Sequence, residues 1–234
     1  MIITIIASIF NLTLFTKFLT FYSLPAPDSV LKWHYELSER ITKMREITLI
    51  TGASSGIGRE TALYFSQKGH PVIIICNKNA EGLNELKSLI KGNNGIVESF
   101  IADVSSYEEM SDIFNILSQK NFLPDILVNN AGISIIGLFQ DMTRDEWDRI
   151  MNVNVGSVYN CCHFAIPDMI NAKSGRIINI SSVWGNAGAS CEAAYSATKG
   201  AVNSLTKALA KELAPSGICV NAIACGAIDT DMNS

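Results

Sequence analysis

Short apolar segments alternate with longer amphipathic segments along the chain from Ile47 onward. The short segments are rich in β-branched residues and the long ones follow a helical period, which predicts strands joined by crossover helices. The predicted strands are Ile47–Thr51, Pro71–Cys76, Ile96–Ile101, Ile126–Asn129, Arg176–Ser181 and Cys219–Ala224. The predicted helices are Ile57–Gln67, Ala80–Ile90, Tyr107–Gln119, Arg144–Ala172 with a break near Asn154, and Ala194–Ala214.

Two of the predicted strands contain apolar residues at successive positions, as in Val72–Ile75 and Ile177–Ile178. Such runs are typical of strands that are covered on both faces, as parallel sheets with crossover helices require. We therefore predict an α/β fold class, a doubly wound parallel sheet with helices on both faces. No repeat or linker interrupts the segment from Ile47 to Asn233, so we expect it to form one domain.

The composition allows a large buried core, since 48% of the 234 residues are hydrophobic and 17% are charged, and it excludes a disordered chain. The net charge is −4 and no long basic run occurs, so we expect no nucleic-acid partner. The three histidines lack the spacing of metal ligands, so we expect no metal site. Six cysteines without paired spacing favour buried free thiols and a cytoplasmic protein.

Residues Met1–Leu24 differ from the rest, because they are almost all apolar and carry one charge, Lys17. The uncharged run Ile2–Thr16 is too short, at about 1.5 Å per residue, to cross a bilayer core of about 30 Å. Three alternatives stay open: a membrane anchor through residues 1–24, a misassigned start with Met44 as the true one, and a poor signal peptide. We expect residues 1–43 to form a hydrophobic leader, with membrane contact only if that leader is real, and residues 44–234 to form the catalytic domain.

The turn between the first strand and the first helix, Thr51–Gly58, contains three glycines in the spacing Gly-x-x-x-Gly-x-Gly. Glycines here let the backbone approach a pyrophosphate, and the free N–H groups of a helix start favour negative charge. Two serines add hydroxyl donors. We therefore predict a dinucleotide-binding turn formed by Thr51, Gly52, Ser54, Ser55, Gly56, Ile57 and Gly58.

The end of the second strand indicates which dinucleotide is bound. An acid there binds the ribose 2′-hydroxyl of NAD, whereas a base accommodates the 2′-phosphate of NADP. The chain has Asn77 and Lys78 at this position and no carboxylate, which favours NADP(H) over NAD(H). Asp103 and Val104, which follow the third strand, are expected at the same edge of the cofactor.

A second group of polar residues carries candidate chemistry. Tyr195 and Lys199 are four residues apart on one helix face, and an ammonium beside a phenol lowers the tyrosine pKa from about 10, which suits proton transfer. Ser182 ends a predicted strand at the edge where open parallel sheets bind ligands, so its hydroxyl is placed to hold a substrate carbonyl. Asn154 falls where a helix break leaves a carbonyl free to anchor a water.

In their order and spacing these motifs resemble the short-chain dehydrogenases/reductases in their compact form, over Ile47–Met232. The resemblance implies an NAD(P)-binding Rossmann fold and transfer of hydride between nicotinamide C4 and a carbonyl carbon. It implies a catalytic tetrad in which Tyr195 donates the proton, Lys199 binds ribose hydroxyls and lowers the tyrosine pKa, Ser182 polarises the carbonyl and Asn154 holds a relay water. Further implied cofactor residues are Asn130, Ala131, Gly132, Tyr195, Lys199, Gly226, Ile228 and Thr230.

The chain departs from the family pattern at two places. Cys225 stands before Gly226 where the family usually has proline. The family also continues for roughly 40–60 residues past the position of Thr230, with a helix that covers the substrate and a further strand. We therefore expect the last strand to be missing, the domain to be truncated at its carboxyl end, and the edge of the sheet to be exposed.

Within the family the body is most similar to the bacterial 3-oxoacyl-acyl-carrier-protein reductases of fatty acid biosynthesis. Their basic residues for docking the acidic carrier correspond to Lys173 and Ser216, of which one is basic. The stretch from Ser181 to Glu192 also resembles the reductase of the 5-aminopentanone group on elongation factor P, in which an acid such as Glu192 meets the substrate ammonium. Candidate substrate residues are Ser182, Trp184 and Glu192.

Two further expectations concern activity and assembly. We expect an oxidoreductase that reduces a small or carrier-linked ketone with NADPH, and the alternative is an inactive, truncated nucleotide-binding fragment. The resemblance also implies a homotetramer or homodimer packed through the long helices that contain Asn154 and Tyr195.

Overall fold

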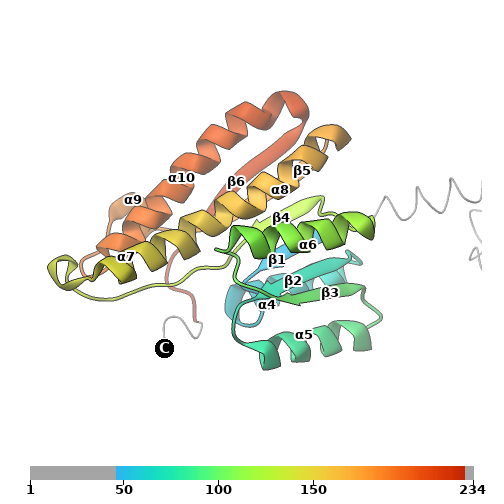
Figure 1. Ribbon diagram of the computed structural model, residues 1–234, viewed down its shortest axis with the longest axis horizontal. Helices are drawn as coiled ribbons and strands as arrows, with labels where there is room; N and C mark the ends of the chain where they lie inside the picture. The colour runs from blue at the N-terminus through green and yellow to red at the C-terminus, as the bar shows by residue number, and fades with distance from the viewer. Residues whose placement is uncertain (1–45, 230–234) are drawn as a thin grey trace, which may run out of the picture. The chain divides into compact units, whose positions relative to one another are not determined.

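The computed structural model describes residues 46–229, which form a six-stranded sheet flanked by helices (Figure 1). Neighbouring strands in this part of the chain are parallel, in the order β3-β2-β1-β4-β5-β6. The strands are β1 (Thr48–Thr51), β2 (Val72–Cys76), β3 (Val97–Ile101), β4 (Ile126–Asn129), β5 (Gly175–Ser182) and β6 (Ile218–Cys225). The predicted doubly wound α/β fold is confirmed, and every predicted strand is present.

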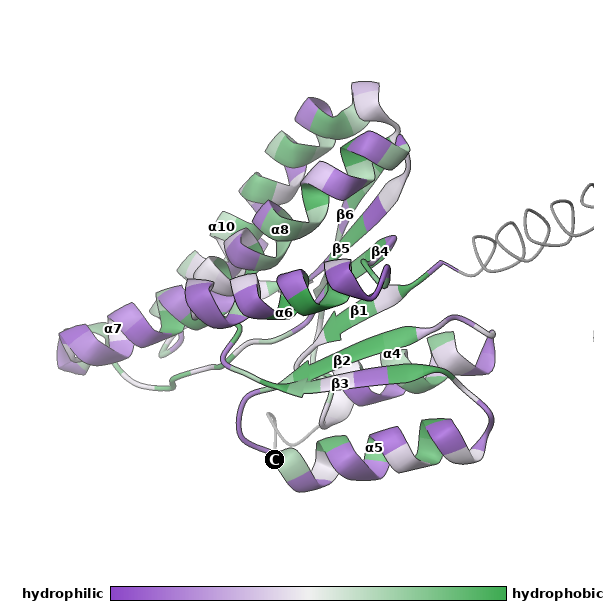
Figure 2. Ribbon diagram, turned by 45° about the vertical axis from the view of Figure 1, so that its right-hand side comes forward, coloured by the Kyte–Doolittle hydropathy of each residue, from purple (hydrophilic) through white to green (hydrophobic). Residues whose placement is uncertain are grey.

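Helices cover both faces of the sheet, as predicted. Those of at least eight residues are α4 (Gly56–Gln67), α5 (Ala80–Gly92), α6 (Tyr107–Gln119), α7 (Arg144–Met151), α8 (Ser157–Ala172) and α10 (Ala193–Leu213). Side chains of α6, α8 and α10 share one hydrophobic core with the sheet, and those of α4 and α5 share the other. Strands β1 and β2 are buried at every residue, and Figure 2 shows β2 as hydrophobic along its length. Continuous apolar runs thus mark the strands buried on both faces.

The long helix expected at residues 144–172 is broken near Asn154, as predicted. A π-helical turn, η2 (Asn152–Gly156), separates α7 from α8. Helix α7 begins with a capping box, in which the Thr143 hydroxyl accepts the Glu146 N–H and the Glu146 carboxylate accepts the Thr143 N–H. Because π turns occur mostly as single-turn insertions at functional sites, this break marks Asn154 for attention.

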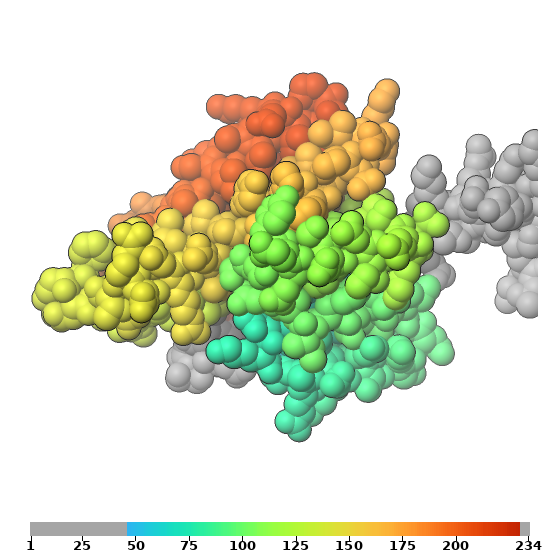
Figure 3. Space-filling model, in the orientation of Figure 1, coloured from blue at the N-terminus to red at the C-terminus, as the bar shows by residue number. Residues whose placement is uncertain are grey.

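Three short elements were not predicted from the sequence. They are η1 (Phe139–Asp141), α9 (Trp184–Ala187) and η3 (Ala214–Ser216). Each is too short to show a hydrophobic period, so residue patterns do not reveal it. In Figures 1 and 3 the yellow segment that contains α7 extends to the left of the sheet.

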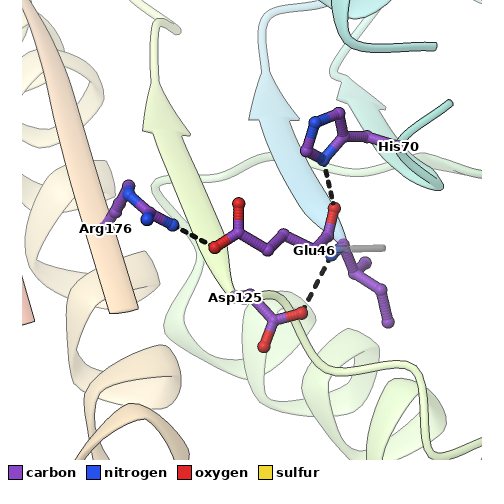
Figure 4. A network of polar contacts seen from close by, with 5 residues as sticks. Glu46, His70, Asp125 and Arg176 are labelled. Carbon is purple, nitrogen blue, oxygen red and sulfur yellow. Dashed lines mark hydrogen bonds and ion pairs between the residues drawn. The ribbon is translucent and has the colours of Figure 1, made fainter. Parts of the chain in front are cut away.

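A polar network closes the amino-terminal edge of the sheet, opposite the ends where ligands bind (Figure 4). The Asp125 carboxylate accepts the N–H of Ile47 at 2.9 Å, and His70 Nδ1 lies 2.8 Å from the Glu46 carbonyl oxygen. The Glu46 carboxylate pairs with Arg176, the second residue of β5. These contacts join the start of β1 to the segments that begin β2, β4 and β5, so the central strands are fixed at this edge.

The cysteine prediction is partly wrong. All six thiols are free, and Cys76, Cys161 and Cys162 are buried as expected. Cys191 and Cys219 are exposed, however, and Cys225 is half-buried. Cys219 and Cys225 lie on β6, which is an edge strand of the described sheet, so an apolar neighbourhood in the sequence did not guarantee burial.

The predictions about the ends of the chain fall mainly outside the described residues. The leader at residues 1–43 and the anchor at residues 1–24 lie there, as does Thr230. Between Glu46 and Asp229 no helix is long and apolar enough to span a bilayer. Ile223 on β6, an edge strand of the described sheet, is 52% exposed. The missing last strand and the truncation of the domain stay predictions.

Candidate active site

The carboxyl ends of β1, β4, β5 and β6 border a cleft of about 650 Å³. This is the edge where an open parallel sheet binds its ligands. The cleft brings together residues that the sequence predicted from four separate segments. The predicted residues that line it are Gly52, Ser54, Ser55, Gly56, Ile57, Asn130, Ala131, Gly132, Ser182, Trp184, Glu192, Tyr195, Lys199, Gly226 and Ile228.

The other predicted site residues lie behind this lining or beside it. Thr51, Gly58 and Asn154 support lining residues through contacts described below. Asn77 and Lys78 follow β2, and Asp103 and Val104 follow β3 at the same edge of the sheet.

The glycine turn is held in shape by Asn130, which follows β4. Asn130 Nδ2 donates to the carbonyl oxygens of Thr51 and Gly52 at 2.9 and 3.1 Å, and the Thr51 hydroxyl accepts the N–H groups of Asn130 and Ala131 at 3.0 Å each. Gly52 has φ +64°, and a Cβ on Gly58 would lie 2.3 Å from the Gly52 carbonyl oxygen. Glycine is therefore required at both positions, for conformation and for close approach.

Helix α4 begins at this turn in a way that suits an anion. Its N-cap, Ser55, makes no side-chain cap hydrogen bond, and its first turn has no acidic residue. By contrast α5, α6 and α7 all begin with a capping side chain and with at least one Asp or Glu. The first N–H groups of α4 thus lack the side-chain partners found at the starts of α5, α6 and α7, and the helix dipole favours negative charge there. Helix α10 also begins without such a cap. A dinucleotide pyrophosphate fits this uncapped helix start.

Asp103 lies in a connected polar group beside the cleft. Its carboxylate accepts the N–H and hydroxyl of Ser105 at 2.9 and 2.6 Å. Burial raises the pKa of Asp103, but the hydrogen bonds from Ser105 and Asn77 and the charge of Lys78 together hold that pKa below its ordinary value. Asn77 and Lys78 are therefore close to Asp103, as their positions after neighbouring strands predicted.

Asn154 is buried, at 1% exposure, and its amide group connects three segments. Its Oδ1 accepts the N–H of Ile133 at 2.8 Å, and its Nδ2 donates to the Ile133 carbonyl at 2.9 Å and to the Thr198 hydroxyl at 3.0 Å. Thr198 in turn donates to the Tyr195 carbonyl at 2.7 Å. Both amide protons are used inside the protein, so a water held by Asn154 would donate to its backbone carbonyl or to the second lone pair of Oδ1.

Tyr195, Lys199 and Ser182 meet in the cleft. The expectation that the pKa of Tyr195 is lowered was wrong. Burial raises the pKa of Tyr195, and a side-chain hydrogen bond with Ser182 offsets this in part. The Glu192 charge raises it further. Lys199 Nζ donates to the Ile180 carbonyl at 2.7 Å and lies at a cation–π distance of 5.6 Å from the tyrosine ring centre, but burial remains the largest influence on the tyrosine pKa.

Ser182 is oriented by the short helix that follows it. The backbone N–H of Trp184 donates to Ser182 Oγ at 3.2 Å, so the hydroxyl proton is directed elsewhere, and Ser182 hydrogen-bonds Tyr195. Helix α9 approaches α10 closely, because a Cβ on Gly185 would lie 2.7 Å from the backbone carbon of Lys199. The serine and the lysine are thus held by one helix contact.

Glu192 is half-buried and faces the cleft, where it accepts the Ser134 hydroxyl at 2.7 Å. The N–H of Gly137 also donates to the Cys191 carbonyl at 2.8 Å, so two contacts join the loop after β4 to the loop before α10. Sequence reasoning missed Ser134 and Ile136 as lining residues, since no motif marks them, and noted Cys225 without placing it there.

The residues expected to dock a carrier lie elsewhere. Lys173 ends α8 just before β5 begins, and Ser216 precedes β6. Both are therefore at the amino-terminal edge of the sheet, opposite the cleft. The structure brings these two segments together, because a Cβ on Gly217 would lie 2.7 Å from the Lys173 carbonyl, but it does not bring them to the site.

The burial of Lys199 leads to a pH-dependent stability. Burial lowers its pKa from 10.5 to about 8, so between these values the unfolded chain binds more protons than the folded one and stability rises with pH. We expect the free energy of unfolding of the unsubstituted chain, minus that of Lys199→Met, to increase by on the order of 3 kcal/mol across this range. Denaturant unfolding at several pH values measures it, and a constant difference would contradict the assignment.

The sequence was compared with those of known proteins. The profile of the short chain dehydrogenase family matches residues 46–234. The chain is 42% identical over 193 residues to 3-oxoacyl-acyl-carrier-protein reductase FabG of Staphylococcus aureus, which covers 81% of this chain and 77% of that one.

Two solved structures share the fold. One is a 3-oxoacyl-acyl-carrier-protein reductase with bound NAD from Brucella melitensis, with a TM-score of 0.74 and 35% identity over 80% of this chain and 72% of that one. The other is a putative NAD(P)-dependent gluconate 5-dehydrogenase from Beutenbergia cavernae with NADP bound at low occupancy. It has a TM-score of 0.75 and 32% identity over 80% of this chain and 74% of that one. Sequence profile, relatives and fold agree, and the chain belongs to the short-chain dehydrogenase family.

Proposed function

We propose that this oxidoreductase reduces a ketone to a secondary alcohol with NADPH, on a 3-oxoacyl group of the kind named for its Staphylococcus aureus relative. The observation that carries the proposal is one cleft lined by Ser182, Tyr195 and Lys199 together with the glycine turn. Proton-transfer groups and the proposed dinucleotide site thereby share one cleft, as hydride transfer to a carbonyl requires.

The chain's own residues fit the cofactor. The uncapped start of α4 would hold the pyrophosphate, and Gly52 lets the backbone come close to it. Lys199 would bind the ribose hydroxyls from its buried position beside Gly132, where a Cβ would lie 3.6 Å from Nζ. When bound, the nicotinamide supplies a hydride to the carbonyl carbon.

Tyr195 supplies the proton. The phenol is protonated at neutral pH, since its pKa lies above its ordinary value, and it can donate to the carbonyl oxygen as negative charge develops there. Ser182, whose oxygen accepts the Trp184 N–H and whose side chain hydrogen-bonds Tyr195, would turn its proton toward the same carbonyl when the substrate binds. Two donors aimed at one oxygen would stabilise the negative charge that develops there in the transition state.

NADP(H) is the preferred cofactor in this proposal. Lys78 lies close enough to Asp103 to lower its pKa, at the edge of the cleft where the ribose 2′-position of the adenosine is expected. Its charge would pair with a 2′-phosphate, which NAD lacks. The two solved relatives hold NAD in one case and NADP in the other, so the residues of this chain carry the choice.

Glu192 supports a second candidate, a ketone that bears an amine, as in the 5-aminopentanone group of elongation factor P. One of its carboxylate oxygens accepts the Ser134 hydroxyl, and the group faces the same cleft as Tyr195. An ammonium group on the substrate would pair with this carboxylate, which carries the opposite charge.

Assembly and location complete the proposal. We infer a homotetramer or homodimer packed through α8 and α10, which the exposed Tyr159 and Ile170 of α8 support. The six free thiols support a reducing compartment such as the cytoplasm. The substrate is a small or carrier-linked ketone.

Replacing Tyr195 by Phe tests the proton donor. We expect Tyr195→Phe to lower kcat/KM for an acetoacetyl thioester by at least about 100-fold while NADPH still binds, because the phenol proton is lost. The rate of NADPH oxidation measures this, with Tyr159→Phe on the exposed face of α8 as the matched control. Wild-type turnover by Tyr195→Phe would exclude the role, and NADPH binding without turnover by the unsubstituted chain would favour the non-catalytic alternative.

Reversing the charge at Lys78 tests the cofactor choice. We expect Lys78→Glu to shift the NADPH-to-NADH ratio of kcat/KM toward NADH by about tenfold or more, because a charge-assisted contact becomes a repulsion. Steady-state rates with both cofactors measure the ratio. Lys68→Glu, at the end of α4 away from the cleft, is the control, and an unchanged ratio in Lys78→Glu would remove this lysine from the site.

Neutralising Glu192 separates the two substrate classes. We expect Glu192→Gln to raise KM about tenfold for an amine-bearing ketone and to leave KM for the acetoacetyl thioester unchanged, because the amide keeps the shape but loses the charge. Ser134→Ala, which keeps the charge, is the control. Equal kinetics of Glu192→Gln and the unsubstituted chain on both ketones would exclude the amine-binding candidate.

A further inference from the structure

The loop Asp103–Ser106 joins β3 to α6 at the carboxyl edge of the sheet, the same edge that holds the cleft. Its local contacts fix its shape, since Asp103 accepts from Ser105, Ser106 accepts the Glu109 N–H at 3.2 Å, and the Glu109 carboxylate accepts the Asp103 N–H at 2.9 Å. These contacts lie within seven residues of one another. They shape the loop but do not fix its position relative to the rest of the cleft.

The side chain of Asn160, on a helix distant in the sequence, hydrogen-bonds this loop. Asn160 on α8 is 4% exposed, and its Nδ2 donates to the carbonyl oxygens of Val104 and Ser105 at 3.1 Å each. Both amide protons are thus spent on this loop, across 55 and 56 residues of sequence. Without them two backbone carbonyls would lose their donors in a buried setting, which proteins avoid.

Helix α8 continues directly from the π turn that contains Asn154. Asn154 hydrogen-bonds the loop after β4 and helix α10, while Asn160 hydrogen-bonds the loop after β3. The same continuous helical segment therefore sets the catalytic side of the cleft and the side that carries Asp103. Any displacement of Asn160 would move Asp103 relative to Asn77 and Lys78.

We propose that Asn160 is a positioning residue that holds the Asp103–Ser106 loop at the distance needed to bind the adenosine half of the cofactor. The proposal rests on the proposed nucleotide-dependent function. Asn160 does not line the cleft, so it acts through Asp103 and Val104 and does not touch the reacting atoms.

The experiment compares two buried hydrogen-bonding side chains in the full chain. We expect Asn160→Leu to raise the Kd for ADP about tenfold, and the KM for NADPH to a similar degree, with kcat at saturating NADPH unchanged. Thr206→Val is the matched control, because Thr206 is also buried and hydrogen-bonds Asn179 and the Val202 carbonyl, away from the cleft. Calorimetry with ADP gives Kd, thermal unfolding gives the loss of stability, and Asn160→Ser replaces the leucine variant if that variant does not fold.

The outcomes separate this proposal from the proposed activity. A similar Kd for ADP in the Asn160 and Thr206 variants would overturn the positioning role, as would a fall in kcat with KM unchanged. Weaker ADP binding by Asn160→Leu in a chain that reduces no ketone would support the role and contradict the activity. A chain that binds no ADP would overturn both.

Discussion

The architecture of the site depends on the buried amide of Asn154, because a polar group at 1% exposure must find all its partners inside the protein. Its partners are both backbone groups of Ile133 and the hydroxyl of Thr198. They fix the loop after β4 to helix α10, one turn from Tyr195 and beside Lys199. The π turn places Asn154 within hydrogen-bonding distance of both segments. The hydrogen bonds that the turn allows hold the cleft residues in place and offset the cost of its irregular backbone.

A second constraint comes from the carboxyl edge of the sheet, where the glycine turn and the chemical residues converge. Asn130 holds the backbone of Thr51 and Gly52, and α4 starts without a capping side chain, so the proposed pyrophosphate site has its shape before any ligand binds. Burial shifts the pKa values of Tyr195 and Lys199 in opposite directions. The pKa of Tyr195 rises, and that of Lys199 falls to about 8. Each shift disfavours the charged form, as desolvation requires.

Most of the fold followed from the sequence, because continuous apolar runs such as Val72–Ile75 mark strands that are covered on both faces. The glycine turn, Asn154 and the Tyr195–Lys199 pair were found from spacing. The contact of Ser134 with Glu192 was not, since it joins residues 58 apart and no local pattern encodes it. The prediction of a lowered pKa for Tyr195 was wrong, because the sequence shows the nearby Lys199 but not the burial that raises the pKa.

Hydride transfer from a nicotinamide to a carbonyl carbon is the central claim, and isotope transfer tests it most directly. The purified chain is incubated with an acetoacetyl thioester and NADPH that carries deuterium on both C4 positions, and the product is examined by mass spectrometry. One deuterium on the new carbinol carbon is predicted for each NADPH consumed. Consumption of NADPH with a product that holds no deuterium at that carbon would contradict the account.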